Sequence, residues 1–160
     1  EGVTRIEGIA VSCLHLLPRS IETLSFGHRF NLRLAETSLP NSLRSLTFDD
    51  AFDQSLEQVK LPHSLQSLKF GHWFNQSMER VTLPSSLESL TFGHSFNQSM
   101  EEVPLPNNLQ TLTFDHNFNW SLEQLMLPSI HTSIHPYKPT SIHTYIHTYI
   151  HAGRQAFIHP

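Results

Sequence analysis

The sequence predicts an all-β or mainly β solenoid, because one 22-residue unit recurs five times without a break between residues 17 and 126. Leu-Pro opens each copy, and no insertion or deletion changes the interval. Within a copy, apolar residues recur at the spacing of short, half-buried strands. We therefore predict five coils with about two short strands per coil.

The copies span residues 17–38, 39–60, 61–82, 83–104 and 105–126, and Leu127-Pro128 opens a sixth that does not continue. Positions 1 to 22 are counted from the Leu of Leu-Pro. In the second copy the first apolar segment is Leu43-x-x-Leu46-x-Phe48, at positions 5, 8 and 10. The second segment is Leu56-x-x-Val59-x-Leu61. Each segment ends in the alternation of a half-buried strand, so we predict strands on two faces of a flattened superhelix.

Two corners of different chemistry separate the predicted strands. Pro at position 2 lacks an N–H for a strand ladder and fixes its own φ, so it ends a strand and begins a turn. The other corner begins at position 11 with Gly or Asp, which suit a positive φ. The residues at position 11 are Gly27, Asp49, Gly71, Gly93 and Asp115.

Two columns of phenylalanine and one of asparagine predict how the coils stack. Ten of the eleven phenylalanines stand at positions 10 and 14, where they would fill the interior. Position 15 is Asn in four copies and Asp53 in the second. Equivalent residues of a solenoid lie roughly 4.8 Å apart, so each of these side chains can bond the turn of its neighbour. We predict a structural, buried ladder there.

The string LPSSLESLTFGHSFNQSMEEVPLP, residues 83–106, resembles the FNIP repeat, a leucine-rich-repeat-like unit of protists. Leu-Pro, the S-L-x-S-L-T-F-G strand and the Phe-Asn turn all match, over about two thirds of the chain. The resemblance implies a leucine-rich-repeat-like solenoid that acts as a recognition surface. The Ile-Pro half of the name motif is replaced by Gln-Ser, as in Phe74-Asn75-Gln76-Ser77.

Composition excludes several classes of partner. Residues 17–126 hold seven Lys or Arg and twelve Asp or Glu, a balance of −5, so we expect no nucleic-acid binding. No apolar run approaches the ~20 residues of a membrane span, so we expect no membrane insertion. The single cysteine, Cys13, cannot form an intrachain disulfide. Because the chain begins with Glu1, we expect a fragment or a processed product.

A file of histidines at position 12 has two interpretations. His28, His72, His94 and His116 could form a metal or pH-sensitive site, but Asp50 interrupts them and an exposed turn residue needs no ligand. We therefore predict no metal and no cofactor. No nucleophile motif, P-loop or CxxC is present, and we predict that the chain is not an enzyme.

The predicted function is non-catalytic protein interaction through variable surface positions. Trp73 is the candidate anchor, because exposed aromatic residues dominate many interfaces, and the alternative is that its ring packs over its neighbours. The alternative is a structural or recently expanded array with no dedicated ligand. The predicted surface comprises Arg29, Trp73, Ser95 and Asn117 at position 13, and Arg44, Gln66, Glu88 and Gln110 at position 6.

The chain divides into three regions. Residues 1–16 are a predicted partial cap, residues 17–128 are the array, and residues 129–160 are a tail. The third region has a four-residue period, as in Thr144-Tyr145-Ile146-His147, which fits a translated microsatellite. Metal binding by His143, His147 and His151 is the alternative interpretation. We predict a disordered tail, and self-association through uncapped solenoid ends.

Overall fold

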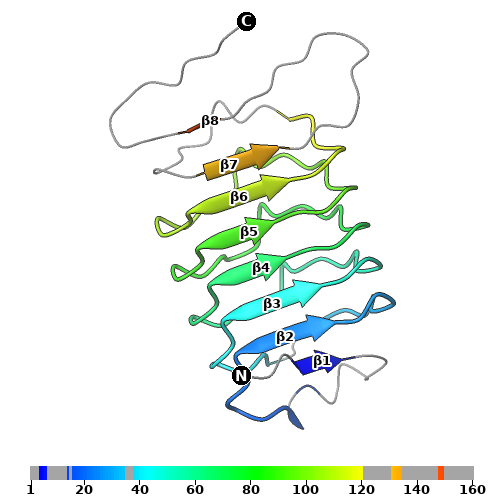
Figure 1. Cartoon of the computed structure of the whole chain (residues 1–160), viewed down its shortest axis with the longest axis vertical. Coiled ribbons are helices and arrows are strands. Elements are labelled where there is room, and N and C mark those ends of the chain that lie inside the picture. Colours follow the sequence, from blue (N-terminus) through cyan, green and yellow to red (C-terminus); the bar gives the residue numbers. More distant parts are fainter. Residues whose placement is uncertain are drawn as a thin grey trace, which may run out of the picture.

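The computed structural model describes residues 4–6, 14, 16–34, 38–120, 131–134 and 148–149. Their strands form a single sheet whose spatial order follows the chain order (Figure 1). The strands are β1 (Thr4–Ile6), β2 (Thr23–Phe26), β3 (Ser45–Phe48), β4 (Ser67–Lys69), β5 (Ser89–Thr91), β6 (Thr111–Phe114), β7 (His131–Ile134) and β8 (Thr148–Tyr149). No helix in the described part of the chain is long and apolar enough to cross a membrane.

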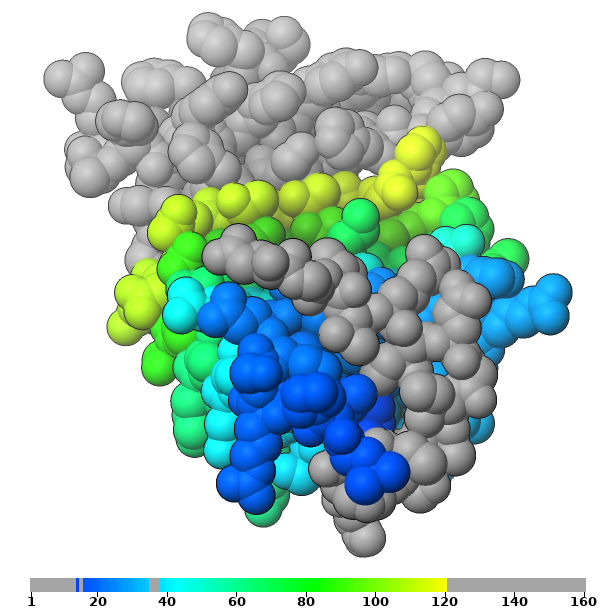
Figure 2. All heavy atoms as spheres, turned by 60° about the horizontal axis from the view of Figure 1, so that its bottom comes forward, coloured from blue at the N-terminus to red at the C-terminus, as the bar shows by residue number. Residues whose placement is uncertain are grey.

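The register of the sheet confirms the solenoid. Strands β1 to β7 are parallel, and Leu24 of β2 lies opposite Leu46 of β3, which lies opposite Leu68 of β4. Each strand from β2 to β5 thus pairs with the same positions of the next copy, 22 residues further along. Figure 2 shows the first five coils lying directly against one another, from the blue first coil to the yellow-green fifth.

The second predicted strand of each coil is absent between residues 38 and 120, and one strand per coil forms there. The second apolar segment is buried as expected, with Leu56 and Val59 at 1% and 5% exposure. Its backbone, however, closes into a turn, because the N–H of Val59 donates to the carbonyl of Leu56 (2.9 Å). The third coil repeats this bond between Val81 and Met78 (3.0 Å). In a strand, residues i and i+3 point to opposite faces, so only the alternation of Val59 and Leu61 predicts a strand. Both residues are buried beside the turn as well, so burial does not distinguish the two conformations.

The phenylalanine columns form the interior, as predicted. All ten side chains at positions 10 and 14 are buried. Phe70 and Phe74 stack with ring centroids 3.8 Å apart within a coil, and Phe74 lies 6.0 Å from Phe96 of the next coil. Aromatic contacts of this kind add stability beyond the buried area alone. The rings therefore join each coil to its neighbours as well as filling it.

Gly71 and Gly93 at position 11 allow a close approach of the coils, which corrects the prediction of a positive φ. Neither Gly71 nor Gly93 lies in the left-handed region. A Cβ on Gly93 would lie 2.1 Å from the carbonyl oxygen of Gly71, and one on Gly71 would lie 2.4 Å from the carbonyl carbon of Asp49. Both obstacles are backbone atoms of the preceding coil. Gly71 and Gly93 thus allow the third and fourth turns to touch the turn before them, whereas Asp49 and Asp115 take the same position in the second and fifth coils.

Both flanks contribute strands to the sheet. β1 pairs with β2, so Thr4 lies opposite Leu24. β7 continues the parallel sheet beyond β6, and β8 pairs with β7 in the antiparallel direction. Two short segments of the tail are therefore strands. The prediction of disorder for residues 129–160 otherwise falls outside the described residues, as do His143, His147, His151 and Cys13.

Candidate functional site: the corner after each strand

The chain leaves each strand through a tight corner, positions 11 to 17, which we call the post-strand corner. In the fourth coil the N–H of Phe96 donates to the carbonyl of Gly93 (3.3 Å), which closes the turn. The N–H of Ser95 donates to the carbonyl of His72 in the preceding coil (2.9 Å). This bond fixes the corners one above another. The side chains at positions 12 and 13 therefore repeat in columns along the edge of the sheet.

Three of the four histidines at position 12 form the predicted file. The rings of His72 and His94 are 4.7 Å apart and nearly parallel, at 5°. The rings of His94 and His116 are 4.9 Å apart and tilted by 36°. These three side chains are half-buried, whereas His28 and Asp50 are exposed. His72, His94 and His116 are therefore half-buried with their rings in contact, and are not the exposed turn residues that the sequence predicts.

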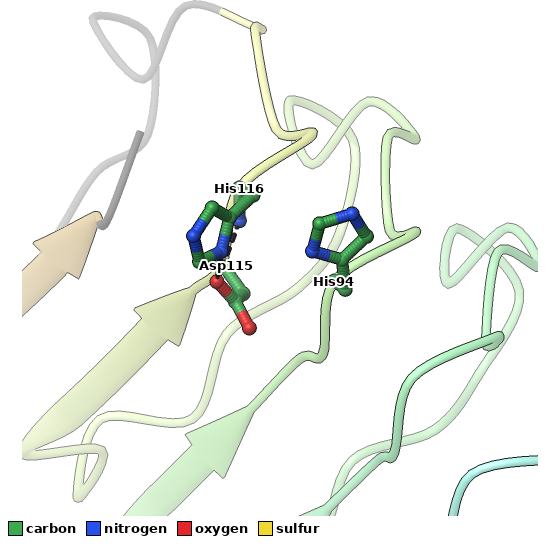
Figure 3. Close-up of side chains that lie close together, drawn as sticks. All are labelled: His94, Asp115 and His116. Atoms are coloured by element: carbon green, nitrogen blue, oxygen red, sulfur yellow. Dashed lines mark hydrogen bonds and ion pairs between the residues drawn. The ribbon is translucent and has the colours of Figure 1, made fainter. Parts of the chain in front are cut away.

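Asp115 joins this file at the fifth coil, as Figure 3 shows. One carboxylate oxygen, Oδ1, accepts a hydrogen bond from the backbone N–H of His116 (2.8 Å) and also contacts Nδ1 of the His116 ring. The ring of His94 lies beside this pair, from the corner that follows β5. One ligand atom from each of His94, Asp115 and His116 lies within 4.8 Å of the others.

The repeat columns, each considered alone, do not predict this cluster. Asp115 belongs to the glycine column, and it was interpreted only as a tolerated substitute there. The signal was present in the sequence, since only the fifth copy combines Asp at position 11, His at position 12 and a His at position 12 of the preceding copy. Adjacent columns and adjacent copies had to be considered together.

The predicted partner-binding residues lie in two separate files. One file follows the strands at position 13, where Arg29, Trp73 and Asn117 are exposed and Ser95 is half-buried. The other precedes the strands at position 6, where Arg44 and Gln110 are exposed and Gln66 and Glu88 are half-buried. The intervening four-residue strand spans roughly 13 Å at about 3.3 Å per residue. The two files are therefore not one cluster.

Trp73 is the most exposed large hydrophobic side chain of residues 17–34 and 38–120, at 59%. Its ring meets the His72 ring edge-on, with centroids 4.7 Å apart and an interplanar angle of 69°. Position 16 holds two further exposed hydrophobic side chains that the sequence did not predict, Leu32 at 48% and Trp120 at 46% exposure. The orientation of the Trp120 ring is fixed by a hydrogen bond, because its indole N–H donates to the carbonyl of Asn97 (3.1 Å). Both residues stand where the middle copies have glutamine, and this change from a polar to an apolar residue was the signal in the sequence.

A family model described as FNIP Repeat matches residues 15–51, 52–95 and 96–135. The chain belongs to the FNIP repeat family. It is also similar to CroV588, whose crystal structure is described as a novel circular LRR protein structure. The identity is 38% and the TM-score 0.53, over 73% of this chain. The FNIP array described here spans 21% of the length of CroV588. No curated protein sequence matches the chain.

The Asn turn of the FNIP repeat forms the predicted ladder between coils. The N–H of Asn75 donates to Oδ1 of Asp53, and the N–H of Asn97 donates to Oδ1 of Asn75, each at 2.9 Å. Asn75 is exposed and Asn97 half-buried, so the expectation of a buried ladder is wrong. The polar bend lies at the surface because only the neighbouring Phe side chain points into the core.

The ladder also explains why Gln-Ser can replace Ile-Pro in this array. Nε2 of Gln76 donates to Oδ1 of Asp53 (2.9 Å), the same oxygen that accepts the N–H of Asn75. Oγ of Ser77 accepts the N–H of Glu79 (3.3 Å), which closes a local turn. The hydrogen bonds of two polar side chains therefore order the bend without a proline ring.

A second ladder, at position 4, was not predicted. Oγ of Ser64 donates to the carbonyl of Leu43 (2.7 Å), and Oγ of Ser86 donates to that of Leu65 (2.7 Å). In the fifth coil Asn108 takes this position, and its Nδ2 donates to the carbonyl of Ser85 (2.8 Å). The recurring serine was visible in the sequence, but the carbonyls that it would satisfy were not.

Two open hollows lie along the Leu-Pro turns instead of the post-strand corners. The larger, of about 570 Å³, is lined by residues that include Leu39, Lys60 and His63. The smaller, of about 420 Å³, includes Leu14 and Arg19. Neither hollow includes a residue of the histidine file or of the two predicted surface files.

Proposed function

We propose that this FNIP array is a non-catalytic protein-interaction module whose partner docks on the post-strand corner around Trp73. FNIP repeats and leucine-rich-repeat-like solenoids are typically non-enzymatic. The observation that carries the proposal is the 59% exposure of the Trp73 side chain. Nearly every other large apolar side chain of the array lies in the core. An indole left in water on an ordered scaffold is a favourable anchor for a partner.

The surroundings of Trp73 suit an anchor that is held before it binds. The edge contact with His72 limits the orientations of the indole. The backbone N–H of Trp73 donates to the carbonyl of Asp50 (2.9 Å), so the position is fixed to the preceding coil. An anchor that is already ordered loses less conformational entropy on binding.

Charge near the anchor indicates the chemistry of the partner. Asp50 of the preceding coil is exposed and Asp53 is half-buried, both in the post-strand corner. The FNIP array as a whole carries five more acidic than basic residues. A partner with an apolar pocket for the indole and a basic rim would be complementary to this corner.

The test is affinity capture with the full chain, followed by a measured Kd for the captured protein. Trp73→Ala is the test variant, and Trp120→Ala is the matched control because it removes an indole exposed to 46%. We expect Trp73→Ala to weaken binding roughly 30-fold, the effect of a hot spot of about 2 kcal/mol, and Trp120→Ala to change it little. Equal affinity of the wild type and Trp73→Ala would overturn the proposal, as would failure to capture any protein.

Self-association is a second mode of interaction that the same preparation tests. The sheet stacks strands without closing on itself in the described residues, and exposed strand edges favour pairing between chains. Sedimentation of the purified chain over a hundredfold range of concentration separates the two modes. A constant monomer mass would exclude self-association and leave the proposal for Trp73 intact.

A further inference from the structure

We propose that His94, Asp115 and His116 bind a divalent transition-metal ion, with Zn²⁺ as the reference ion. The site lies between the fourth and fifth coils, at the corners that follow β5 and β6 (Figure 3). It does not depend on the interaction proposed for Trp73. Two imidazoles and one carboxylate are a ligand set that suits Zn²⁺, with water completing an open tetrahedron.

The distances between the ligand atoms are compatible with such a site. One atom from each of the three side chains lies within 4.8 Å of the other two. Zn–N and Zn–O bonds of about 2.0–2.2 Å place two ligands of a tetrahedral ion roughly 3.3–3.5 Å apart. Metal binding requires rotations of these side chains that bring His94 nearer and move the contacting atoms of Asp115 and His116 apart.

The backbone already holds the two histidines at the spacing of the coils. The N–H of Asn117 donates to the carbonyl of His94 (3.2 Å), so the corners of the fourth and fifth coils are joined beside the two rings. Asp115 is fixed by the hydrogen bond that its Oδ1 accepts from the N–H of His116. A site whose ligands are ordered before metal binding loses little entropy on binding.

The contact between Asp115 and His116 places a carboxylate oxygen beside an imidazole nitrogen. A carboxylate oxygen and an imidazole nitrogen both carry lone pairs, and a single proton or cation between them joins the two atoms. A proton fulfils that role without metal, and a metal ion can replace it when His94 supplies a third ligand. The side chains of Asp115 and His116 are only 36% and 34% exposed, so water screens the contact only partly.

The neighbouring coils show why residues 38–120 hold one such cluster. The ring pair of His72 and His94 stacks nearly parallel and has Gly93 where the fifth coil has Asp115. The pair of His94 and His116 is tilted by 36°. Asp115 therefore supplies a third ligand that the earlier pair lacks. Two imidazoles without a third ligand would bind the ion far more weakly.

The experiment must separate this site from the histidines of the tail. We would use the full chain with six tail histidines changed to Gln, and titrate it with Zn²⁺ by calorimetry. The tail histidines are His131, His135, His143, His147, His151 and His159. In this background we expect one Zn²⁺ per chain. Saturating Zn²⁺ should raise Tm by roughly 5 °C, because the ion binds only the folded array.

Single substitutions then locate the ligands. His94→Ala, Asp115→Ala and His116→Ala should each weaken Zn²⁺ binding roughly tenfold or more and abolish the rise in Tm. His28→Ala is the matched control, because it removes a position-12 histidine next to Asp50 instead of another histidine. It should leave the affinity within about threefold of the background.

Folding of each variant is checked by its melting curve in EDTA. If Asp115→Ala fails to fold, Asp115→Asn keeps an oxygen for the N–H of His116 and removes the charge, and it should still weaken Zn²⁺ binding. The proposal is overturned by absence of Zn²⁺ binding in the tail-substituted background. It is equally overturned if folded ligand variants bind Zn²⁺ as tightly as His28→Ala.

Discussion

The two halves of each coil are joined to their neighbours by different atoms. The strand half, positions 5 to 14, uses backbone pairing between parallel strands, as between β3 and β4. The return half, positions 15 to 22 and 1 to 4, has no strand between residues 38 and 120. There the side chains of Asn, Gln and Ser supply the hydrogen bonds between coils. A solenoid can therefore keep one spacing on both sides with a sheet on only one.

Burial does not distinguish the halves. Phe74 of the strand half and Met78 of the return half are both fully buried, at 0% exposure. Both contribute to the same hydrophobic core. The difference lies in how backbone polar groups are satisfied, which is a separate requirement from filling the interior.

The largest expected effect breaks the core at the strand half. Phe74→Ala should lower the free energy of unfolding by about 3–5 kcal/mol, because it leaves a cavity beside Phe70 and between Phe52 and Phe96. Met78→Ala should cost about 2–5 kcal/mol if the return half belongs to the same cooperative unit. Chemical denaturation measures both. Loss of stability in Phe74→Ala but none in Met78→Ala would contradict a single shared core.

A smaller effect is expected where the two turns touch. Gly93→Ala should cost about 1–3 kcal/mol, because the added Cβ meets the backbone carbonyl of Gly71 and the coils must separate. Ser95→Ala in the same corner is the control and should stay within about 0.5 kcal/mol. Thermal melting of the two variants compares them directly. Tolerance of Gly93→Ala would show that the coils do not need this close approach.

The smallest effect tests the side-chain ladder of the return half. Asn75→Ala removes the acceptor for the N–H of Asn97 and for Nε2 of Gln98 (2.9 and 3.1 Å), and should cost about 0.5–1.5 kcal/mol. Asn75→Asp keeps the acceptor, as Asp53 does in the second coil, and should cost less. Urea denaturation resolves the pair. An equal loss in both variants would mean that the oxygen at position 15 does not carry the effect.

Sequence reasoning succeeded where one column determined one role. The 22-residue interval gave the solenoid, and Phe70 and Phe74 were placed in the core because apolar columns must face inward. The ladder through Asn75 followed from the fixed spacing of coils. Those inferences needed only the periodicity and the chemistry of a single residue type.

Reasoning failed where the answer depended on backbone conformation or on two columns together. The alternation of Val59 and Leu61 predicts a strand, but the N–H of Val59 closes a turn with Leu56 and both alternating residues are buried all the same. The role of Gly93 depends on a carbonyl of another coil. The cluster of Asp115 with His94 needs both the Asp that replaces Gly at position 11 and the His that recurs at position 12. No single column contains that information.

The polar ladders of the return half have a direction. In each bond the later coil donates and the earlier coil accepts, as from Ser86 to Leu65 and from Asn97 to Asn75. During synthesis the acceptors of a coil therefore exist before the donors that need them. Loss of a coil from the C-terminal end leaves acceptor oxygens without a donor. Loss of a coil from the N-terminal end leaves N–H and O–H donors without an acceptor, which proteins tolerate less well. The array is thus better suited to shortening and growth at its C-terminal end.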